Sequence, residues 1–132
     1  MDEFSVLLVD DEKEFLETLL KRLRKRRIKV TGANSGEEAI KIVKETPPDV
    51  VVLDVRMQGM DGIQTLAEIK KIRPAIEVIM LTGHANLDVA VEGMDLGAFD
   101  YLMKPTDVDE LLYKLEDAFK RKIIKERQTK SL

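Results

Sequence analysis

The sequence contains no cysteine and no tryptophan, and aromatic residues make up only 5% of its 132 residues. The absence of cysteine excludes a disulfide framework and metal sites built on thiolates. No apolar run approaches the roughly 18 residues that are typical of a membrane-spanning helix. Positions 2 and 3 are acidic, where a secretory signal peptide carries basic residues. We therefore predict a cytoplasmic protein that does not associate with a membrane.

Neither sign of charge dominates the chain. The 22 Lys and Arg residues nearly balance the 25 Asp and Glu residues, which leaves a formal net charge of -3. This balance gives no overall attraction to nucleic acid or to an anionic surface. Hydrophobic residues account for 44% of the chain, a globular composition. At about 150 residues per domain, the length predicts a single domain.

Short apolar runs alternate with amphipathic stretches along the whole chain. We predict strands at residues 6–9, 28–31, 50–53, 78–81 and 101–103. Each run is followed by apolar residues at helical spacing. Continuous Val, Leu and Ile runs are typical of strands buried on both faces, and helical crossovers between them make a sheet parallel. We therefore predict an α/β fold, a doubly wound five-stranded parallel sheet in the flavodoxin-like order 2-1-3-4-5 with helices on both faces.

Polar side chains follow the predicted strands at the points where they end. Asp10 and Asp11 follow the first strand, Asp54 the third, Thr82 the fourth and Lys104 the fifth. In this topology the carboxyl ends of the strands share one rim, so these groups should converge. Each alone is an ordinary cap or turn residue, but together they indicate a site. Clustered carboxylates need a cation or a raised pKa at neutral pH. Mg²⁺ is the cation expected there, and an Asp beside it can act as a nucleophile toward a phosphoryl group.

The motifs around these residues resemble those of response-regulator receiver domains, the phosphoacceptor modules of two-component signalling with a chemotaxis-regulator-like fold. The resemblance covers residues 4–122. Its motifs are Val9-Asp10-Asp11, Leu53-Asp54-Val55-Arg56-Met57, Gly59-Met60-Asp61-Gly62, Leu81-Thr82-Gly83 and the segment 97–105, which ends in Lys104-Pro105.

The resemblance assigns an acceptor and a metal site. It implies that Asp54 takes a phosphoryl group from a phosphohistidine on a sensor histidine kinase or phosphotransfer protein. It implies that Mg²⁺ is held by Asp10, Asp11, Asp54 and the backbone carbonyl of Arg56. The expected function is therefore a phosphorylation-activated switch with slow self-dephosphorylation, and not a turnover enzyme.

The resemblance also assigns the residues that sense the phosphoryl group. Thr82 and Lys104 are expected to bind its oxygens, Tyr101 matches the switch aromatic of the family, and the peptide bond before Pro105 is expected to be cis. Phosphorylation should then repack the surface built from the fourth helix, the fifth strand and the fifth helix.

Two further residues are candidates for tuning the lifetime of the phosphoryl group. Arg56 and His84 lie two positions beyond Asp54 and Thr82. We hypothesise that their bulk hinders an attacking water and slows the loss of the phosphoryl group. The alternative is that both are solvated loop residues.

Surface residues suggest how the domain meets partners. Val89 and Leu112 fall beside the inner stripes of their helices and are expected to be exposed, which favours a homodimer through the fourth helix, fifth strand and fifth helix. We interpret the basic cluster over residues 21–29 as a solvent-exposed face at the end of the first helix. Direct binding of nucleic acid by this domain is therefore not expected. Such binding would require a steep salt dependence.

The end of the chain is basic. We divide the sequence into a receiver domain at residues 1–122 and a helical tail or linker at residues 123–132. Such a tail resembles the connector to an output domain in transcriptional activators of the nitrogen-regulator type. The chain could be a stand-alone receiver or a part of a longer regulator, and the tail favours the second reading.

Three other functions compete with the switch. A phosphohydrolase of the haloacid-dehalogenase type would use Asp54 as nucleophile, but it needs a general acid two residues later, where this chain has Arg56. A flavin mononucleotide binder would meet an acidic rim that repels its phosphate. A docking module that is never phosphorylated would not need the full acid set.

Overall fold

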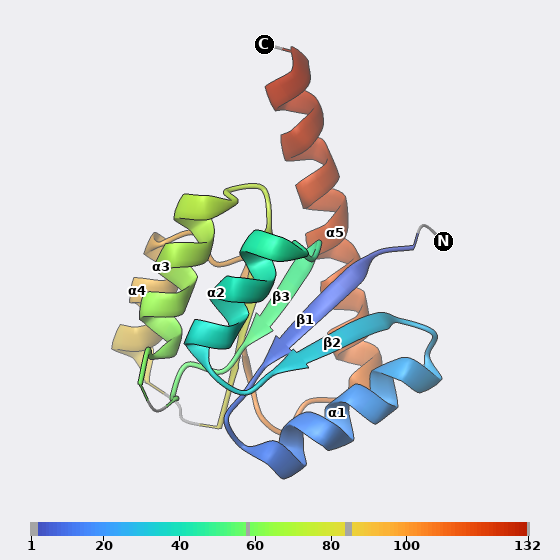
Figure 1. Cartoon of the computed structure of the whole chain (residues 1–132), viewed down its shortest axis with the longest axis vertical. Coiled ribbons are helices and arrows are strands. Elements are labelled where there is room, and N and C mark those ends of the chain that lie inside the picture. The colour runs from blue at the N-terminus through green and yellow to red at the C-terminus, as the bar shows by residue number, and fades with distance from the viewer. Residues whose placement is uncertain (1–2, 58, 84–85, 132) are drawn as a thin grey trace.

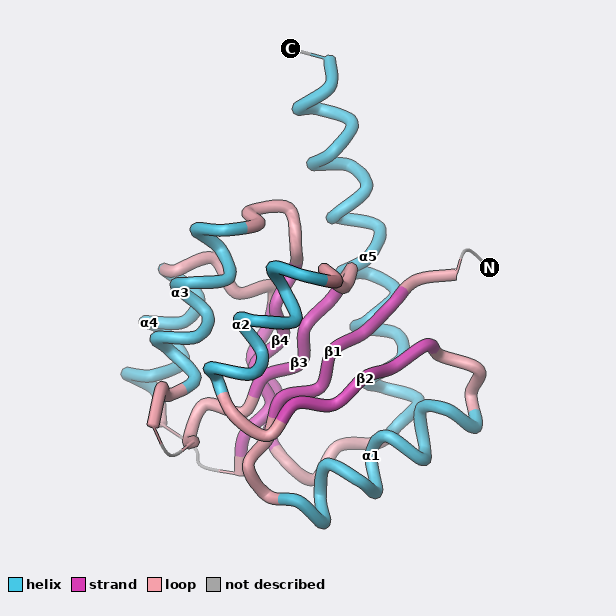
Figure 2. Tube along the Cα trace, in the orientation of Figure 1, coloured by secondary structure: helices cyan, strands magenta, loops and turns pink. Residues whose placement is uncertain are grey.

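The computed structural model describes residues 3–57, 59–83 and 86–131, with side chains described through residue 128. Figure 1 and Figure 2 show a sheet that lies between two layers of helices. The strands are β1 (Ser5–Val9), β2 (Lys29–Ala33), β3 (Val50–Leu53), β4 (Glu77–Thr82) and β5 (Asp100–Met103). The helices are α1 (Lys13–Lys25), α2 (Gly36–Glu45), α3 (Gly62–Ile72), α4 (Leu87–Asp95) and α5 (Val108–Ser131).

The strands pair in parallel in the order β2-β1-β3-β4-β5, which confirms the predicted fold class. Val9 and Leu53, the last residues of β1 and β3, are register partners. The pairing extends one step further, because the Asp54 N–H donates to the Val9 carbonyl at 2.9 Å. Asp10 and Asp54 therefore leave neighbouring strands at the same level.

Alternate residues of the central strands face opposite helical layers. In β1, Val6 and Leu8 pack in the core beneath α1 and α5, whereas Leu7 and Val9 pack in the core beneath α2 and α3. Fully burying one such side chain contributes about 1.5–3 kcal/mol. Because apolar side chains cover both faces of the sheet, a site built from polar side chains is expected at the ends of the strands.

The segment that follows β3 is fixed by the N-terminus of α3. Asp61 caps α3 and forms a capping box with Gln64, each side chain bonding to the other residue's backbone N–H. A side chain at Gly62 would place its Cβ 2.4 Å from the carbonyl oxygen of Asp54. Only glycine allows α3 to begin this close to the end of β3, so the helix fixes the loop beside Asp54.

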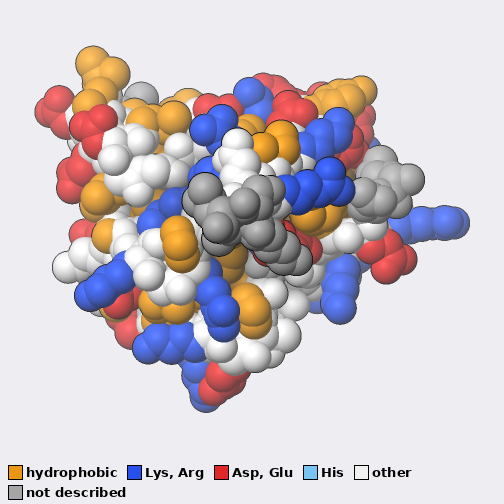
Figure 3. All heavy atoms as spheres, turned by 90° about the horizontal axis from the view of Figure 1, so that it is seen from above, with side chains coloured by type: hydrophobic (Ala, Val, Ile, Leu, Met, Phe, Trp, Pro, Cys, Tyr) orange, Lys and Arg blue, Asp and Glu red, His pale blue; other side chains and the backbone are white. Residues whose placement is uncertain are grey.

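Helix α5 runs without a break to Ser131, across the boundary at residue 122 that we placed between the domain and its tail. Its last turns project beyond the sheet (Figure 1). Figure 3 views the molecule from this end, where basic side chains are interspersed with acidic and apolar ones. Two lysines tie the extension to the body: Lys122 pairs with Asp49 at 2.7 Å, and Lys125 with Glu77. Within the described part of the chain, no helix combines the length and apolarity needed to cross a membrane.

The expected exposure of Val89 and Leu112 is wrong. Both are half-buried: Val89 packs against the core beneath α2 and α3, and Leu112 against the core beneath α1 and α5. The apolar stripe of a helix on a sheet spans about 100° or more, which covers positions beside its centre. The exposed apolar side chains on α4, β5 and α5 are instead Leu87, Val91, Met94, Met103, Tyr113 and Ile124.

Candidate functional site

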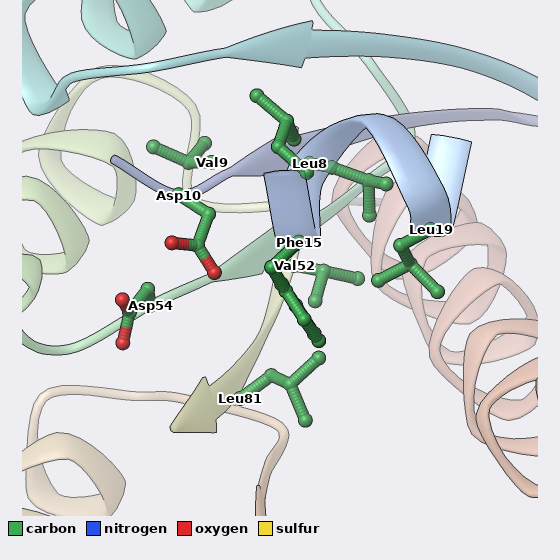
Figure 4. A pocket seen from close by; sticks show the side chains of 9 residues that line it. Leu8, Val9, Asp10, Phe15, Leu19, Val52, Asp54 and Leu81 are labelled. Atoms are coloured by element: carbon green, nitrogen blue, oxygen red, sulfur yellow. The ribbon is translucent and has the colours of Figure 1, made fainter. Parts of the chain in front are cut away.

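One cation and three carboxylates meet at the carboxyl rim of the sheet. The Lys104 ammonium donates to Asp10 Oδ2 at 2.6 Å and to Glu12 Oε1 at 3.3 Å, and it lies 3.6 Å from Asp54 Oδ2. Carboxylate oxygens of Asp10, Glu12 and Asp54 lie within 4.8 Å of one another. Figure 4 shows Asp10 and Asp54 side by side at the ends of their strands. These groups come from three separate parts of the chain, as the topology requires.

The two aspartates are buried, although they carry the chemistry. Asp10 and Asp54 are each 4% exposed. Behind them, apolar side chains that include Phe15 and Leu81 surround a cavity of only 10 Å³ (Figure 4). The Lys104 ammonium lies 4.1 Å from the centre of the Phe15 ring. The charges of Asp10, Asp54 and Lys104 therefore lie against apolar side chains, where solvent screens them weakly.

This environment makes Asp54 a weaker acid than a free aspartate. Burial and the neighbouring Asp10 carboxylate raise the pKa of Asp54 from 3.8 to about 6. The Lys104 charge and the hydrogen bond from the Arg56 N–H, at 3.3 Å, oppose the rise without cancelling it. A perturbed carboxyl in a charged rim is typical of a functional site.

Lys104 keeps its charge. Burial acts to lower the pKa of Lys104, but the hydrogen bond to Asp10 and the charges of Asp10 and Asp54 outweigh it, so the net shift is upward. The Lys104–Pro105 peptide bond is cis. The backbone N–H of Lys104 donates to the carbonyl of Thr82 at 2.8 Å, which continues the pairing of β4 with β5.

The remaining predicted site residues lie around this centre. Thr82 is buried at the end of β4, at 1% exposed. Tyr101 is half-buried and packs against the core beneath α2 and α3. Arg56 is exposed and lines, with Asp11, a hollow of 610 Å³ bounded by α3 and α4. His84 lies outside the described residues.

The structure differs from our expectation in the acid that joins the cluster. Asp11, predicted as a direct metal ligand, is exposed, and its role stays a prediction. Glu12 takes the third place among the described carboxylates that could hold an ion. The sequence signal was the unbroken acidic run Asp10-Asp11-Glu12, of which we considered only the first two.

The donor set fits a hard divalent cation. Among the residues that the structure describes, three carboxylates face the Lys104 ammonium, so the centre carries excess negative charge. All the donors are oxygens, which Mg²⁺ prefers. Arg56 follows Asp54 by two residues, and its N–H bonds to the Asp54 carboxylate, so its backbone lies beside the acids.

The sequence profile of the family described as "Response regulator receiver domain" matches residues 6–116. The chain belongs to this family. Its members are phosphorylation-regulated signalling modules and not turnover enzymes.

Curated relatives are named as transcriptional regulators. The chain is 44% identical over 117 residues to "Transcriptional regulatory protein ZraR" of Escherichia coli strain K12, covering 89% of this chain and 26% of the relative. It is 39% identical over 113 residues to "DNA-binding transcriptional regulator NtrC" of the same strain, covering 86% of this chain and 24% of the relative. The chain thus spans about a quarter of the length of these relatives.

Solved structures share the fold over nearly the whole chain. A CheY-like receiver domain protein from Methanospirillum hungatei JF-1 superposes with a TM-score of 0.88 at 26% identity, covering 94% of this chain and 99% of that one. NtrX from Brucella abortus superposes with a TM-score of 0.89 at 29% identity, covering 99% of this chain and 30% of that one.

Proposed function

We propose that this receiver accepts a phosphoryl group on Asp54 from a phosphohistidine of a sensor histidine kinase or phosphotransfer protein. The observation that carries the proposal is the placement of the buried Asp54 carboxylate 3.6 Å from the Lys104 ammonium. In the transfer, an Asp54 oxygen bonds to phosphorus while the phosphorus–nitrogen bond breaks. The electron pair returns to the imidazole, which takes up a proton from water.

The chain's own groups carry most of this chemistry. Lys104 offsets the negative charge of the incoming phosphoryl group. Mg²⁺, when bound, would supply further positive charge at the phosphoryl oxygens. We propose Asp10, Asp11, Asp54 and the backbone carbonyl of Arg56 as its ligands.

The phosphoryl group would switch the domain by drawing donors toward it. An acyl phosphate adds up to about two negative charges and three acceptor oxygens. Thr82 and Lys104 are the proposed donors, and an inward shift of Thr82 would leave space for the Tyr101 ring. To change the ratio of active to inactive conformations from 1:99 to 99:1, phosphorylation must favour the active conformation by about 5.5 kcal/mol. About two to four charge-assisted hydrogen bonds, at about 1.5–3 kcal/mol each, would supply this free energy.

The acceptor is tested by intact-mass spectrometry after incubation with acetyl phosphate and Mg²⁺. We expect the chain to gain one phosphoryl group, and Asp54→Asn to gain none. The matched control Asp88→Asn removes an exposed acid from α4 and should gain the group like the wild type. A phosphorylated Asp54→Asn variant would contradict the assignment. Release of many equivalents of phosphate from simple esters would support the phosphohydrolase instead.

Arg56 is proposed to slow the loss of the phosphoryl group. Its side chain is exposed while its N–H bonds to Asp54, so Arg56→Ala removes the bulk and keeps the backbone contacts. We expect the phosphoryl group to be lost about three to ten times faster, a change of at most about 1.4 kcal/mol in the barrier. The measurement is the decay of the phosphorylated mass with time. Arg73→Ala, an exposed arginine after α3, is the control, and equal decay in all three proteins would remove the hypothesis.

We propose that the surface of α4, β5 and α5 transmits the switch to an output domain or to a second copy of the chain. The proposal is supported by the exposed apolar side chains there, with Leu87 at 78% and Tyr113 at 71% exposed. Exposed apolar groups of this size gather at interaction sites. Sedimentation velocity with and without beryllofluoride, a mimic of the acyl phosphate, measures the formation of a homodimer. The same molecular mass in both conditions would count against the homodimer.

A further inference from the structure

The first turn of α1 holds the Lys104 ammonium from two sides. Glu12 accepts its hydrogen bond at 3.3 Å, and the ring of Phe15, three residues later, lies 4.1 Å from the ammonium nitrogen. A carboxylate and an aromatic face both attract an ammonium ion. Lys104 is therefore engaged by α1 as well as by Asp10 and Asp54.

The Glu12 carboxylate is not used to cap its helix by a hydrogen bond. Glu12 is the N-cap of α1, yet its side chain makes no capping hydrogen bond. The backbone N–H of Glu12 is instead satisfied by Asp10 Oδ1 at 2.9 Å. Residues favoured at this position are short ones that can reach back to the helix N–H groups. The longer Glu12 side chain extends to Lys104 instead.

The partners of Lys104 differ in how easily they can release it. The Asp10 and Asp54 side chains are 6% and 5% exposed, whereas the Glu12 side chain is 64% exposed. A carboxylate that is already hydrated can turn toward water with little loss, whereas a buried one cannot. Glu12 is thus the partner that Lys104 can most easily exchange for another anion.

We propose that Glu12 is a positioning residue that holds Lys104 in the resting state and competes with the phosphoryl group for it. The proposal rests on the proposed acceptor role of Asp54. A phosphoryl group on Asp54 must draw Lys104 away from Glu12 and also meets the negative charge of Glu12 nearby. Both effects favour the unphosphorylated state, so the charge of Glu12 sets how readily the switch turns on.

Binding of beryllofluoride tests this competition. In the presence of Mg²⁺ we expect Glu12→Gln to bind beryllofluoride about three to ten times more tightly than the wild type, the effect of one partly screened charge. Fluorine NMR measures the bound fraction in a titration. The matched control is Glu14→Gln, which removes the same charge from an exposed residue in the same turn and should leave the affinity unchanged.

A second readout follows Lys104 itself in the protein without metal or beryllofluoride. The ¹⁵N-detected ammonium signal of Lys104 should exchange faster with water in Glu12→Gln than in the wild type or in Glu14→Gln. A change in helix stability alone would not alter this signal selectively. An unchanged Lys104 signal overturns the proposal.

The titrations also separate the role of Glu12 from the function on which it rests. A wild type that binds no beryllofluoride overturns the proposed acceptor site. A wild type that binds it with the same affinity as Glu12→Gln overturns only the role of Glu12. The titrations are run at saturating Mg²⁺, because the affinity for Mg²⁺ alone should itself fall about two- to fivefold in Glu12→Gln through the loss of one partly screened charge. A loss of tenfold or more would make Glu12 a metal ligand and reject the proposal.

Discussion

Replacing Asp54 by asparagine is expected to raise the free energy of unfolding by about 2–3 kcal/mol near neutral pH when EDTA has removed divalent cations, at about 1.4 kcal/mol per pKa unit. The reason is the rise in the pKa of Asp54 from 3.8 to about 6, which burial and Asp10 cause. Above pH 6 the folded protein must hold this carboxylate charged beside another one. Asparagine has nearly the same shape and removes the charge.

The upward direction of the Asp54 pKa shift determines the pH range in which the effect is seen. The folded state binds the Asp54 proton more tightly than the unfolded chain, because its pKa is raised. The resulting stabilisation is therefore fully present below about pH 3.8 and is lost as the pH rises through about 6. The advantage of Asp54→Asn should thus be small near pH 4 and should grow to its full size above pH 6. Urea denaturation at several pH values in EDTA measures it.

Two comparisons make this result specific to the site. Asp88→Asn, an exposed acid at the start of α4, should leave stability within about 0.5 kcal/mol of the wild type at every pH. Adding Mg²⁺ at about 100 times its Kd should stabilise the wild type by about 2.7 kcal/mol, and the variant by much less. An advantage of equal size at pH 4 and pH 8 would assign the effect to packing and reject the electrostatic explanation.

The positions of the principal site residues could be predicted because they follow from strand ends. Apolar runs locate β1 and β3, and in a parallel sheet the residues after each strand share one rim. Asp10 and Asp54 therefore had to be close, and the pairing of β4 with β5 brings Lys104 to the same rim.

The contacts made by single side chains could not be predicted in this way. Lys104 and Glu12 are 92 residues apart in the sequence. Their contact depends on the orientation of the first turn of α1 relative to the sheet and on the rotamers of both side chains. The same holds for Leu112, whose burial depends on how far α5 rotates on the sheet. Local cues were nevertheless present at Asp61 and Gln64, where the spacing of a capping box could have located the start of α3.

At the opposite end of the sheet, Glu77→Gln is expected to lower the free energy of unfolding by about 3 kcal/mol, the loss typical of breaking a buried ion pair. Glu77 opens β4, is 1% exposed, and pairs with Lys70 at 3.6 Å and with Lys125 of α5. Glutamine fills the same space but leaves two ammonium groups facing each other. Burial already lowers the pKa of Lys70, which Glu77 acts to raise, so the change leaves the Lys70 charge less supported.

The size and the pH dependence of the loss identify its origin. Chemical denaturation near neutral pH measures the loss. Asp100→Asn is the control, because the pair of Asp100 with Lys114 at 2.8 Å is more exposed and should contribute much less than the buried pair. A lowered pKa means that the unfolded chain binds the Lys70 proton more tightly, so the stability of Glu77→Gln should recover as the pH rises toward 10. Because Glu77 and Thr82 lie at opposite ends of β4, the folded variant should still gain one phosphoryl group from acetyl phosphate. A loss equal to that of Asp100→Asn, or one that is independent of pH, would show that the buried pair does not hold the end of α5 to the sheet.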